Sequence, residues 1–302
     1  MPRFCWAGAF LTFVIRKPLL GQAVGAVYLL TIILGGAARP LFEAAVVGRT
    51  AFRWPELVVL AVLVLGALAA GYLARRGLAS LGRLSEYGAV VAIVLIVVVG
   101  LTVLPKVNWA NYTPFLTHGW LPVLRGAGTL MQRFSLAYIL LLFLPRTENA
   151  AGAVNWIFVT IFLVAVLMGV GILSIGIHGA PVVAATFLPS LQLIQDSVFG
   201  RAGWLTALAV VGWLLSLVLK AGLGYWLVSA TLAETMDRDF RRLIVPVGIG
   251  VLIVANLLWS NVDESYIVFA QYFRWLAYTA GMAAPALLLL AATWQQPGEQ
   301  NP

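Results

Sequence analysis

Long runs of apolar residues, separated by short polar segments, dominate the sequence. A bilayer-spanning α-helix needs about 20 mostly apolar residues. Eight runs meet this requirement, at residues 20–38, 57–74, 87–105, 126–145, 154–177, 204–230, 243–260 and 276–293. The first run can continue as helix to about residue 47, because Arg39 and Glu43 have the i,i+4 spacing of a helical ion pair. The pattern predicts an all-α integral membrane protein with about eight transmembrane helices in a single transmembrane domain, residues 1–302.

A shorter apolar segment lies upstream, within an N-terminal stub of residues 1–18. Its apolar part, residues 4–15, is too short to span a bilayer. It is not typical of a signal peptide either, because Arg16 and Lys17 stand where a small-residue cleavage site is expected. We expect an interfacial helix or the remainder of a truncated segment.

Composition supports a membrane protein and argues against a nucleic-acid partner. Hydrophobic residues make up 62% of the chain, charged residues only 10%, and the mean hydropathy is +0.98. Soluble domains carry roughly a quarter charged residues. The net charge of +8 comes from basic residues between the apolar runs, where loops meet anionic lipid headgroups. We therefore expect a lipid bilayer as the partner and no binding of nucleic acid.

The basic residues also predict the orientation of the chain. One side collects ten: Arg3, Arg16, Lys17, Arg75, Arg76, Arg83, Arg146, Arg238, Arg241 and Arg242. The other side collects seven: Arg39, Arg49, Arg53, Lys106, Arg125, Arg201 and Arg274. Basic loops stay on the cytoplasmic side, so the excess predicts that both termini are cytoplasmic. The outer loops 106–125 and 179–201 contain prolines, which argue against long helices there.

No catalytic constellation is evident in the sequence. The eleven acidic residues are scattered, and neither His118 nor His178 has a nearby Ser or Cys partner. The single cysteine, Cys5, cannot form an internal disulfide, and no residues have zinc-site spacing. We expect a protein that is not an enzyme, with no cofactor and no metal.

Ionisable residues inside the runs are the candidates for function. Lys220 lies midway along its run, where a charge costs roughly 3 kcal/mol or more. Either it faces a ligand or ion pathway inside the bundle, or it is paired structurally or snorkels to the interface. Gln132, Arg133 and Ser135 form a polar group in the run 126–145, which indicates either an interrupted helix beside a cavity or a helix that begins later.

Small residues and one further charge pair have simpler explanations. Gly21 with Gly25, and Gly222 with Gly224, are sufficiently explained by close helix packing. We interpret Arg39 and Glu43 as a structural ion pair rather than a substrate site.

Several residue groups resemble, in order and spacing, the B-subunit family of spore germination receptors. These endospore germination permeases belong to the amino acid–polyamine–organocation (APC) transporter superfamily. The residues that carry the resemblance are Lys17-Pro18-Leu19-Leu20-Gly21 with Gly25 and Tyr28; Arg39, Phe42 and Glu43; Gly77 to Arg83 with Glu86; Asn111 to Leu124 with Pro114, Gly119 and Pro122; and Phe199, Arg201, Trp213, Lys220 and Tyr225.

The resemblance implies a LeuT/APC-like inverted repeat of five plus five helices. This chain resembles the family from just before its third span, so the resemblance implies that the first two spans are missing and that the inverted repeat is incomplete. The family's sixth span shows small residues followed by Glu at its break, whereas this chain has Arg133-Phe134-Ser135-Leu136-Ala137-Tyr138. Both departures bear on ligand binding.

The function implied by the resemblance is sensing of a small nutrient, such as an amino acid, in the inner membrane of a spore. The implied partners are germinant receptor A-type and C-type subunits. The expected ligand-binding residues are Tyr28, Gln132, Ser135, Tyr138 and Lys220. Two alternatives remain open: a secondary amino-acid transporter, coupled to protons through Lys220, and a truncated scaffold that binds no ligand.

Overall fold

The computed structural model describes residues 29–50, 52–113, 119–134, 150–186, 189–197, 204–236, 238–260 and 274–279. Within these ranges all regular secondary structure is helical, which confirms the predicted all-α class. Among the described residues, five helices are long and apolar enough to cross a membrane: Leu29–Arg49, Glu56–Arg76, Leu78–Lys106, Thr206–Ala233 and Phe240–Leu258. They correspond to the first, second, third, sixth and seventh predicted spans. The protein is an integral membrane protein; the inverted repeat stays a prediction.

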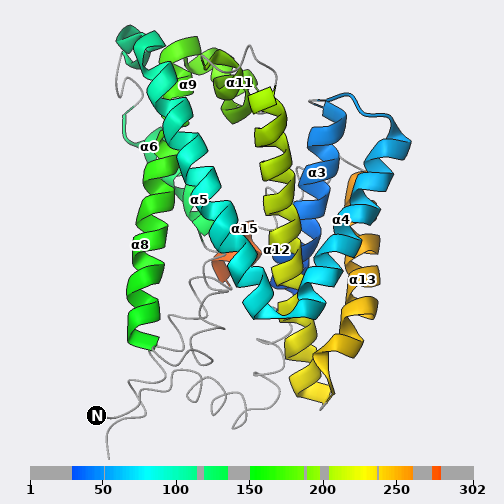
Figure 1. Ribbon diagram of the computed structural model, residues 1–302. Coiled ribbons are helices and arrows are strands. Elements are labelled where there is room, and N and C mark those ends of the chain that lie inside the picture. The colour runs from blue at the N-terminus through cyan, green and yellow to red at the C-terminus, as the bar shows by residue number, and fades with distance from the viewer. Residues whose placement is uncertain are drawn as a thin grey trace, which may run out of the picture.

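A bundle of four helical segments forms the main core (Figure 1). Its members are η1 with α3 (Ile32–Ala38 and Arg39–Thr50), α4 (Glu56–Arg76), α12 (Trp204–Met236) and α13 (Phe240–Ser260). We call it the bundle. The segment α12 contacts the three others, and most of the fully buried side chains lie where these helices meet.

Glycines bring these helices close together. A Cβ atom on Gly224 would lie 2.7 Å from the carbonyl carbon of Gly36, so the backbones of α12 and η1 touch. A Cβ atom on Gly222 would lie 3.2 Å from the carbonyl oxygen of Ala70 in α4. Small residues permit such approach between membrane helices. The predicted packing role of Gly222 and Gly224 is confirmed.

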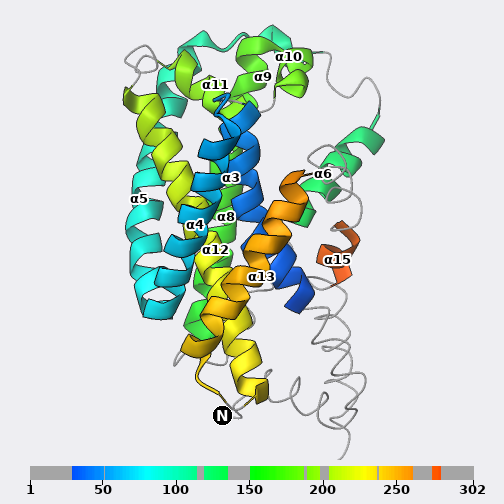
Figure 2. The ribbon, with the colours of Figure 1, turned by 90° about the vertical axis from the view of Figure 1, so that its right-hand side faces the viewer.

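A second group of helices diverges from the bundle toward one end (Figure 1), the end where short helices form the top layer in Figure 2. The long helices are α5 (Leu78–Val103) and α8 (Ala150–Gly169). Across the end of α5 lies a layer of short elements, which we call the cap: η2 (Leu104–Lys106), η3 (Trp109–Tyr112), α9 (Ile172–His178), α10 (Ala180–Ala185) and α11 (Pro189–Asp196). The α3–α4 connection lies at the same end, the cap end, and the α4–α5 and α12–α13 connections lie at the opposite end.

Several predicted boundaries are wrong for identifiable local reasons. The third span begins at Leu78 instead of residue 87, because Gly77 adopts a φ of +89° and turns the chain within one residue. The predicted continuous span 154–177 is two helices, α8 and α9, separated at residues 170–171. The prolines of loop 179–201 act as predicted: they stand at the starts of the short helices α10 and α11.

The two outlying described helices are α6 (Leu121–Phe134) and α15 (Arg274–Tyr278). The Tyr278 hydroxyl donates a hydrogen bond to the carbonyl oxygen of Gly128, which links them. The helix α6 begins five residues before the predicted run at 126, so the alternative of a later start is wrong. The rest of that run, and most of the predicted run 276–293, lie outside the described residues.

Candidate functional site

Lys220 lies at the centre of the longest described helix. The candidate span Thr206–Ala233 has its midpoint at this residue, as the sequence predicts. Its side chain is exposed, although Ala221, Gly222 and Gly224 beside it are buried. No hydrogen bond or ion pair connects Lys220 to any residue that the structure describes. The ammonium group therefore projects from a side of α12 that the bundle leaves open.

Arg39 and Glu43 form the predicted ion pair. The Arg39 Nε donates to Glu43 Oε1 at 2.8 Å, one helical turn away, and the two side chains are 24% and 36% exposed. One part of the prediction is wrong: Arg39 was counted among the loop residues of the outer side. It is the middle residue of the candidate span Leu29–Arg49, so the pair lies inside a membrane helix.

A widened helical turn precedes this pair. The segment η1 is a π-helix, and the Arg39 backbone N–H bonds to the carbonyl of Leu34, five residues back. Pro40 has no N–H to donate to the carbonyl of Gly36, and a proline ring crowds that carbonyl. The wider turn removes this conflict and leaves the Gly36 carbonyl against Gly224. Such π segments are frequent at functional sites.

Contacts between helices place Arg39 and Lys220 at the same depth. The segments η1–α3 and α12 are antiparallel, and Gly36 faces Gly224. Further along, Gly66 of α4 faces both Leu41 of α3, at 3.2 Å, and Val218 of α12, at 4.0 Å. Both charged residues lie between these two levels. Because both are also midpoints of their spans, we call Arg39, Glu43 and Lys220 the midspan charges.

The midspan charges have an excess of positive charge. Among the described residues, two cations and one carboxylate lie on neighbouring helices at about the middle of the membrane span. Ionisable groups at this depth are costly and mark ligand or ion sites more often than loop charges do. This arrangement can receive a carboxylate at the cations and an ammonium group at Glu43.

The other predicted ligand-binding residues are not brought together here. Gln132 lies in the last turn of α6, and Tyr28, Ser135 and Tyr138 lie outside the described residues. Their participation stays a prediction. Among the described residues no three His, Cys, Asp or Glu side chains are grouped as a metal site would require.

A second polar cluster joins the cap. His178 Nε2 lies 2.6 Å from Asp196 Oδ2, and Lys106 Nζ donates to the backbone carbonyl of the same aspartate. The amide of Asn111 donates to the Gly176 carbonyl at 2.8 Å. Sequence analysis missed this cluster, because its members come from two loops separated by about 70 residues. It fixes α9 and α11 to the end of α5.

Comparison with known proteins agrees with the membrane fold and the resemblance. Residues 16–265 match the profile of a family described as spore germination protein. The chain is 24% identical over 255 residues to spore germination protein YndE of Bacillus subtilis (strain 168), an alignment that covers 80% of this chain and 66% of YndE. The chain thus spans slightly less than two thirds of that relative. No solved structure matches the chain. The protein belongs to the spore germination protein family.

Proposed function

We propose that this chain is the membrane subunit of a spore germinant receptor and binds a small nutrient, such as an amino acid, at the midspan charges. The observation that carries the proposal is that Arg39 and Lys220 lie level, at the middle of two adjacent spans, with Glu43 one turn away. Binding acts by shifting the helix bundle between conformations. We propose no covalent chemistry.

The charges suit an α-amino acid. Among the described residues, two cations and one acid lie at this level, and the carboxylate of a ligand would be attracted to the cations. Hydrogen bonds between charged groups are roughly twice as strong as neutral ones and gain further from a low local dielectric. We further propose that Glu43, which bonds Arg39 through one oxygen, accepts from the ligand's ammonium group through the other, a role in addition to the structural one that the sequence predicts. Tyr28, Gln132, Ser135 and Tyr138 are expected to line the same pocket.

We further propose the inner membrane of the spore as the location, with A-type and C-type receptor subunits as partners. Six arginines lie in the α4–α5 and α12–α13 connections, at the end opposite the cap, or within two helical turns of them: Arg75, Arg76, Arg83, Arg238, Arg241 and Arg242. The α3–α4 connection and η2 carry three basic residues: Arg49, Arg53 and Lys106. The positive-inside rule then favours a cytoplasmic opposite end and cytoplasmic termini.

The alternative is a secondary amino-acid transporter that couples to protons. The Lys220 ammonium favours it, because this charge lies at the middle of a span, is exposed, and has no ion-pair partner among the residues that the structure describes. The two functions differ in flux: a receptor binds without net transport, whereas a transporter moves the bound amino acid.

The test is equilibrium binding of a panel of amino acids and sugars to the purified full chain. We compare Lys220→Met, which removes the charge, with Lys220→Arg, which keeps it, and with Lys106→Met, a lysine at the cap. We expect saturable binding of an amino acid that weakens by about tenfold or more in Lys220→Met and persists in the other two variants.

Absence of binding by the wild-type chain, or equal binding by wild type and Lys220→Met, would contradict the proposal. Uptake into proteoliposomes then separates the two functions. Binding without uptake supports the receptor, and uptake that Lys220→Met abolishes supports the transporter.

A further inference from the structure

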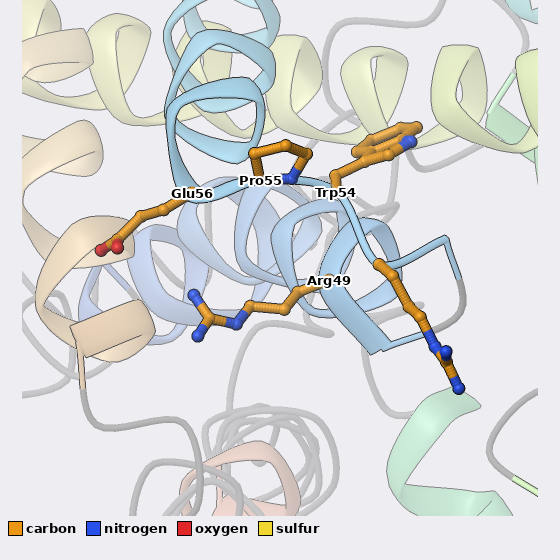
Figure 3. Close-up of a pocket in the computed structure, with 5 residues that line it drawn as sticks. Arg49, Trp54, Pro55 and Glu56 are labelled. Atoms are coloured by element: carbon orange, nitrogen blue, oxygen red, sulfur yellow. The ribbon is translucent and has the colours of Figure 1, made fainter.

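Charged side chains at the edge of the bundle are accessible from outside the protein. Figure 3 shows an example at the α3–α4 connection, where Arg49, Arg53 and Glu56 line a hollow together with Trp54 and Pro55. All three charged side chains are exposed. Such groups can exchange hydrogen bonds with their surroundings. Two hydroxyl groups inside the bundle have no such access, because their side chains are buried.

These hydroxyls belong to Tyr225 and Ser229, which lie one helical turn apart on α12 and are 1% and 0% exposed. Neither the Tyr225 hydroxyl nor the Ser229 Oγ has a hydrogen-bond partner among the residues that the structure describes. A buried polar group without a partner costs free energy, and the lipid around the bundle offers none. Phenylalanine and alanine would fill the same space without this cost. The two hydroxyls therefore indicate a hydrogen-bonding partner outside the described part of the protein.

Glycines on two helices make room for the Tyr225 ring. A Cβ atom on Gly248 of α13 would lie 3.2 Å from Cε2 of the ring and 4.0 Å from Cζ, the carbon that bears the hydroxyl. A Cβ atom on Gly71 of α4 would lie 3.9 Å from the same Cε2. Gly248 is next to the midpoint of the candidate span Phe240–Leu258. The hydroxyl is therefore held between three helices, at about the middle of the membrane span.

The buried side chains of the two helices that the ring contacts cannot bond to the hydroxyl. In the described parts of α4 and α13 every buried side chain is apolar: Val59, Leu63, Ala67, Ala70, Ala74, Ile244, Val251 and Ala255. A helical carbonyl oxygen keeps one lone pair free beside its helical hydrogen bond. A water molecule can accept from the Tyr225 hydroxyl and donate to such a carbonyl. The hydroxyl is then satisfied without a second polar side chain.

We propose that the Tyr225 hydroxyl binds an ordered water molecule inside the bundle, and that the Ser229 Oγ binds a second one a turn further along α12. Lys220 lies five residues before Tyr225, about 140° away around the helix. The water sites therefore lie on another side of α12 and share no residue with the midspan charges.

Water at this place would let the contacts of α12 change. A hydrogen bond through water is nearly as favourable as a direct one, and a water molecule can reorient toward a new partner. The contact of α12 with α4 and α13 can therefore shift without leaving a buried group unpaired. This use of the water rests on the proposed function, whereas the water sites themselves do not.

The experiment compares wild type with Tyr225→Phe and Ser229→Ala, each as the full chain in lipid nanodiscs. Tyr87→Phe is the control, because Tyr87 on α5 is 72% exposed. Thermal unfolding measures the contribution of each hydroxyl to stability. Radiolytic hydroxyl labelling in isotopically labelled water tests whether water lies beside the buried ring, since the radicals form from water next to the side chain. The reference for labelling is Phe42, an aromatic residue of the same core that has no hydroxyl and is 4% exposed.

We expect Tyr225→Phe to lower the unfolding temperature by about 2–4 °C, because a hydrogen bond to water is lost, and Tyr87→Phe to leave it unchanged. Ser229→Ala should lower it in the same direction. We also expect Tyr225 to be labelled several times faster than Phe42, after correction for the intrinsic reactivities of the two rings.

An unchanged or higher unfolding temperature for Tyr225→Phe would overturn the proposal, because removal of an unpaired buried hydroxyl is not destabilising. Equal labelling of Tyr225 and Phe42 would overturn it as well, and would assign the partner of the hydroxyl to the protein itself. Neither measurement involves a nutrient, so the outcome is independent of the binding test at Lys220.

Discussion

The bundle and the cap are held together by different interactions. In the bundle, backbones meet at Gly36 and Gly224, and the contact surfaces are almost entirely apolar. In the cap, side chains bond to backbone carbonyls across long stretches of sequence: Asn111 to Gly176 at 2.8 Å, and Tyr112 to Ile172 at 3.0 Å. The bundle relies on close fit, and the cap relies on hydrogen bonds.

This difference follows from the surroundings. Lipid is as apolar as a leucine side chain, so helices within it associate through close packing of small residues. Near the membrane surface, irregular backbone has polar groups that need partners, and Asn, His and Lys supply them. The midspan charges are ionisable groups at the middle of the spans that form the bundle, which is why we assign them a function.

The largest loss of stability is expected at the backbone contact between Gly224 of α12 and Gly36 of η1. Gly224→Leu places a side chain against the backbone of η1, which cannot move aside, and should destabilise the protein by about 3 kcal/mol or more. Yield and thermal unfolding in detergent measure this. Gly212→Leu is the control, because no atom lies within 4 Å of a Cβ at that position of α12. Similar losses in both variants would show that the η1–α12 contact is not special.

The next effect concerns the ion pair inside the bundle. Glu43→Leu leaves Arg39 without this carboxylate and should cost about 2 kcal/mol, less than for a fully buried pair because both groups are partly exposed. The double variant Arg39→Met with Glu43→Leu should recover part of the loss, since it also removes the charge that lost the Glu43 carboxylate. Thermal unfolding of all three proteins measures it. A double variant less stable than Glu43→Leu would contradict the interpretation as a structural pair.

A smaller and local effect is expected in the cap. Gly176→Ala directs a Cβ atom to within 2.7 Å of Val107 and should loosen the cap by about 1–2 kcal/mol. Hydrogen exchange should rise in η3 and α9 and stay unchanged in α4 and α12. Gly169→Ala is the matched control, because its Cβ atom would meet nothing within 4 Å. Faster exchange throughout the bundle would mean that cap and bundle unfold as one unit.

The smallest effect is expected at the contact between α9 and α11. His178→Gln shortens the reach to Asp196 and should cost about 1 kcal/mol, the net value of a typical hydrogen bond. Limited proteolysis should cut the segment between α9 and α12 faster, while thermal unfolding of the bundle stays the same. Unchanged proteolysis would show that Lys106 and Asn111 are sufficient to hold the cap.

The sequence predicts features that depend on local pattern. Apolar runs of 18 or more residues place five of the eight predicted spans, and the i,i+4 spacing identifies the Arg39–Glu43 pair. The predicted helix boundaries are wrong where a single residue forms the turn between two helices. At Gly77 a single positive φ replaces a predicted twelve-residue loop, because glycine alone adopts that conformation without strain.

Features that depend on tertiary contact are not predictable in this way. The sequence predicts that the first span ends at residue 38, and Arg39 is therefore counted with the basic residues of the outer side. The π segment and the packing of Gly36 on Gly224 keep this region helical, so the arginine lies in the membrane. The level alignment with Lys220 follows from the same contact. The roles of Tyr28, Ser135 and Tyr138 stay predictions.

The central claim is that Arg39 and Lys220 lie level on neighbouring helices around a polar site. The most direct test is cross-linking of Arg39→Cys with Lys220→Cys by a short bifunctional thiol reagent, in a Cys5→Ser background. The comparison is Arg39→Cys with Trp213→Cys. Trp213 lies two turns, about 10 Å, from Lys220 toward the N-terminal end of α12. We predict faster cross-linking at Lys220, slowed by an amino acid that binds. Faster cross-linking at Trp213 would contradict the account.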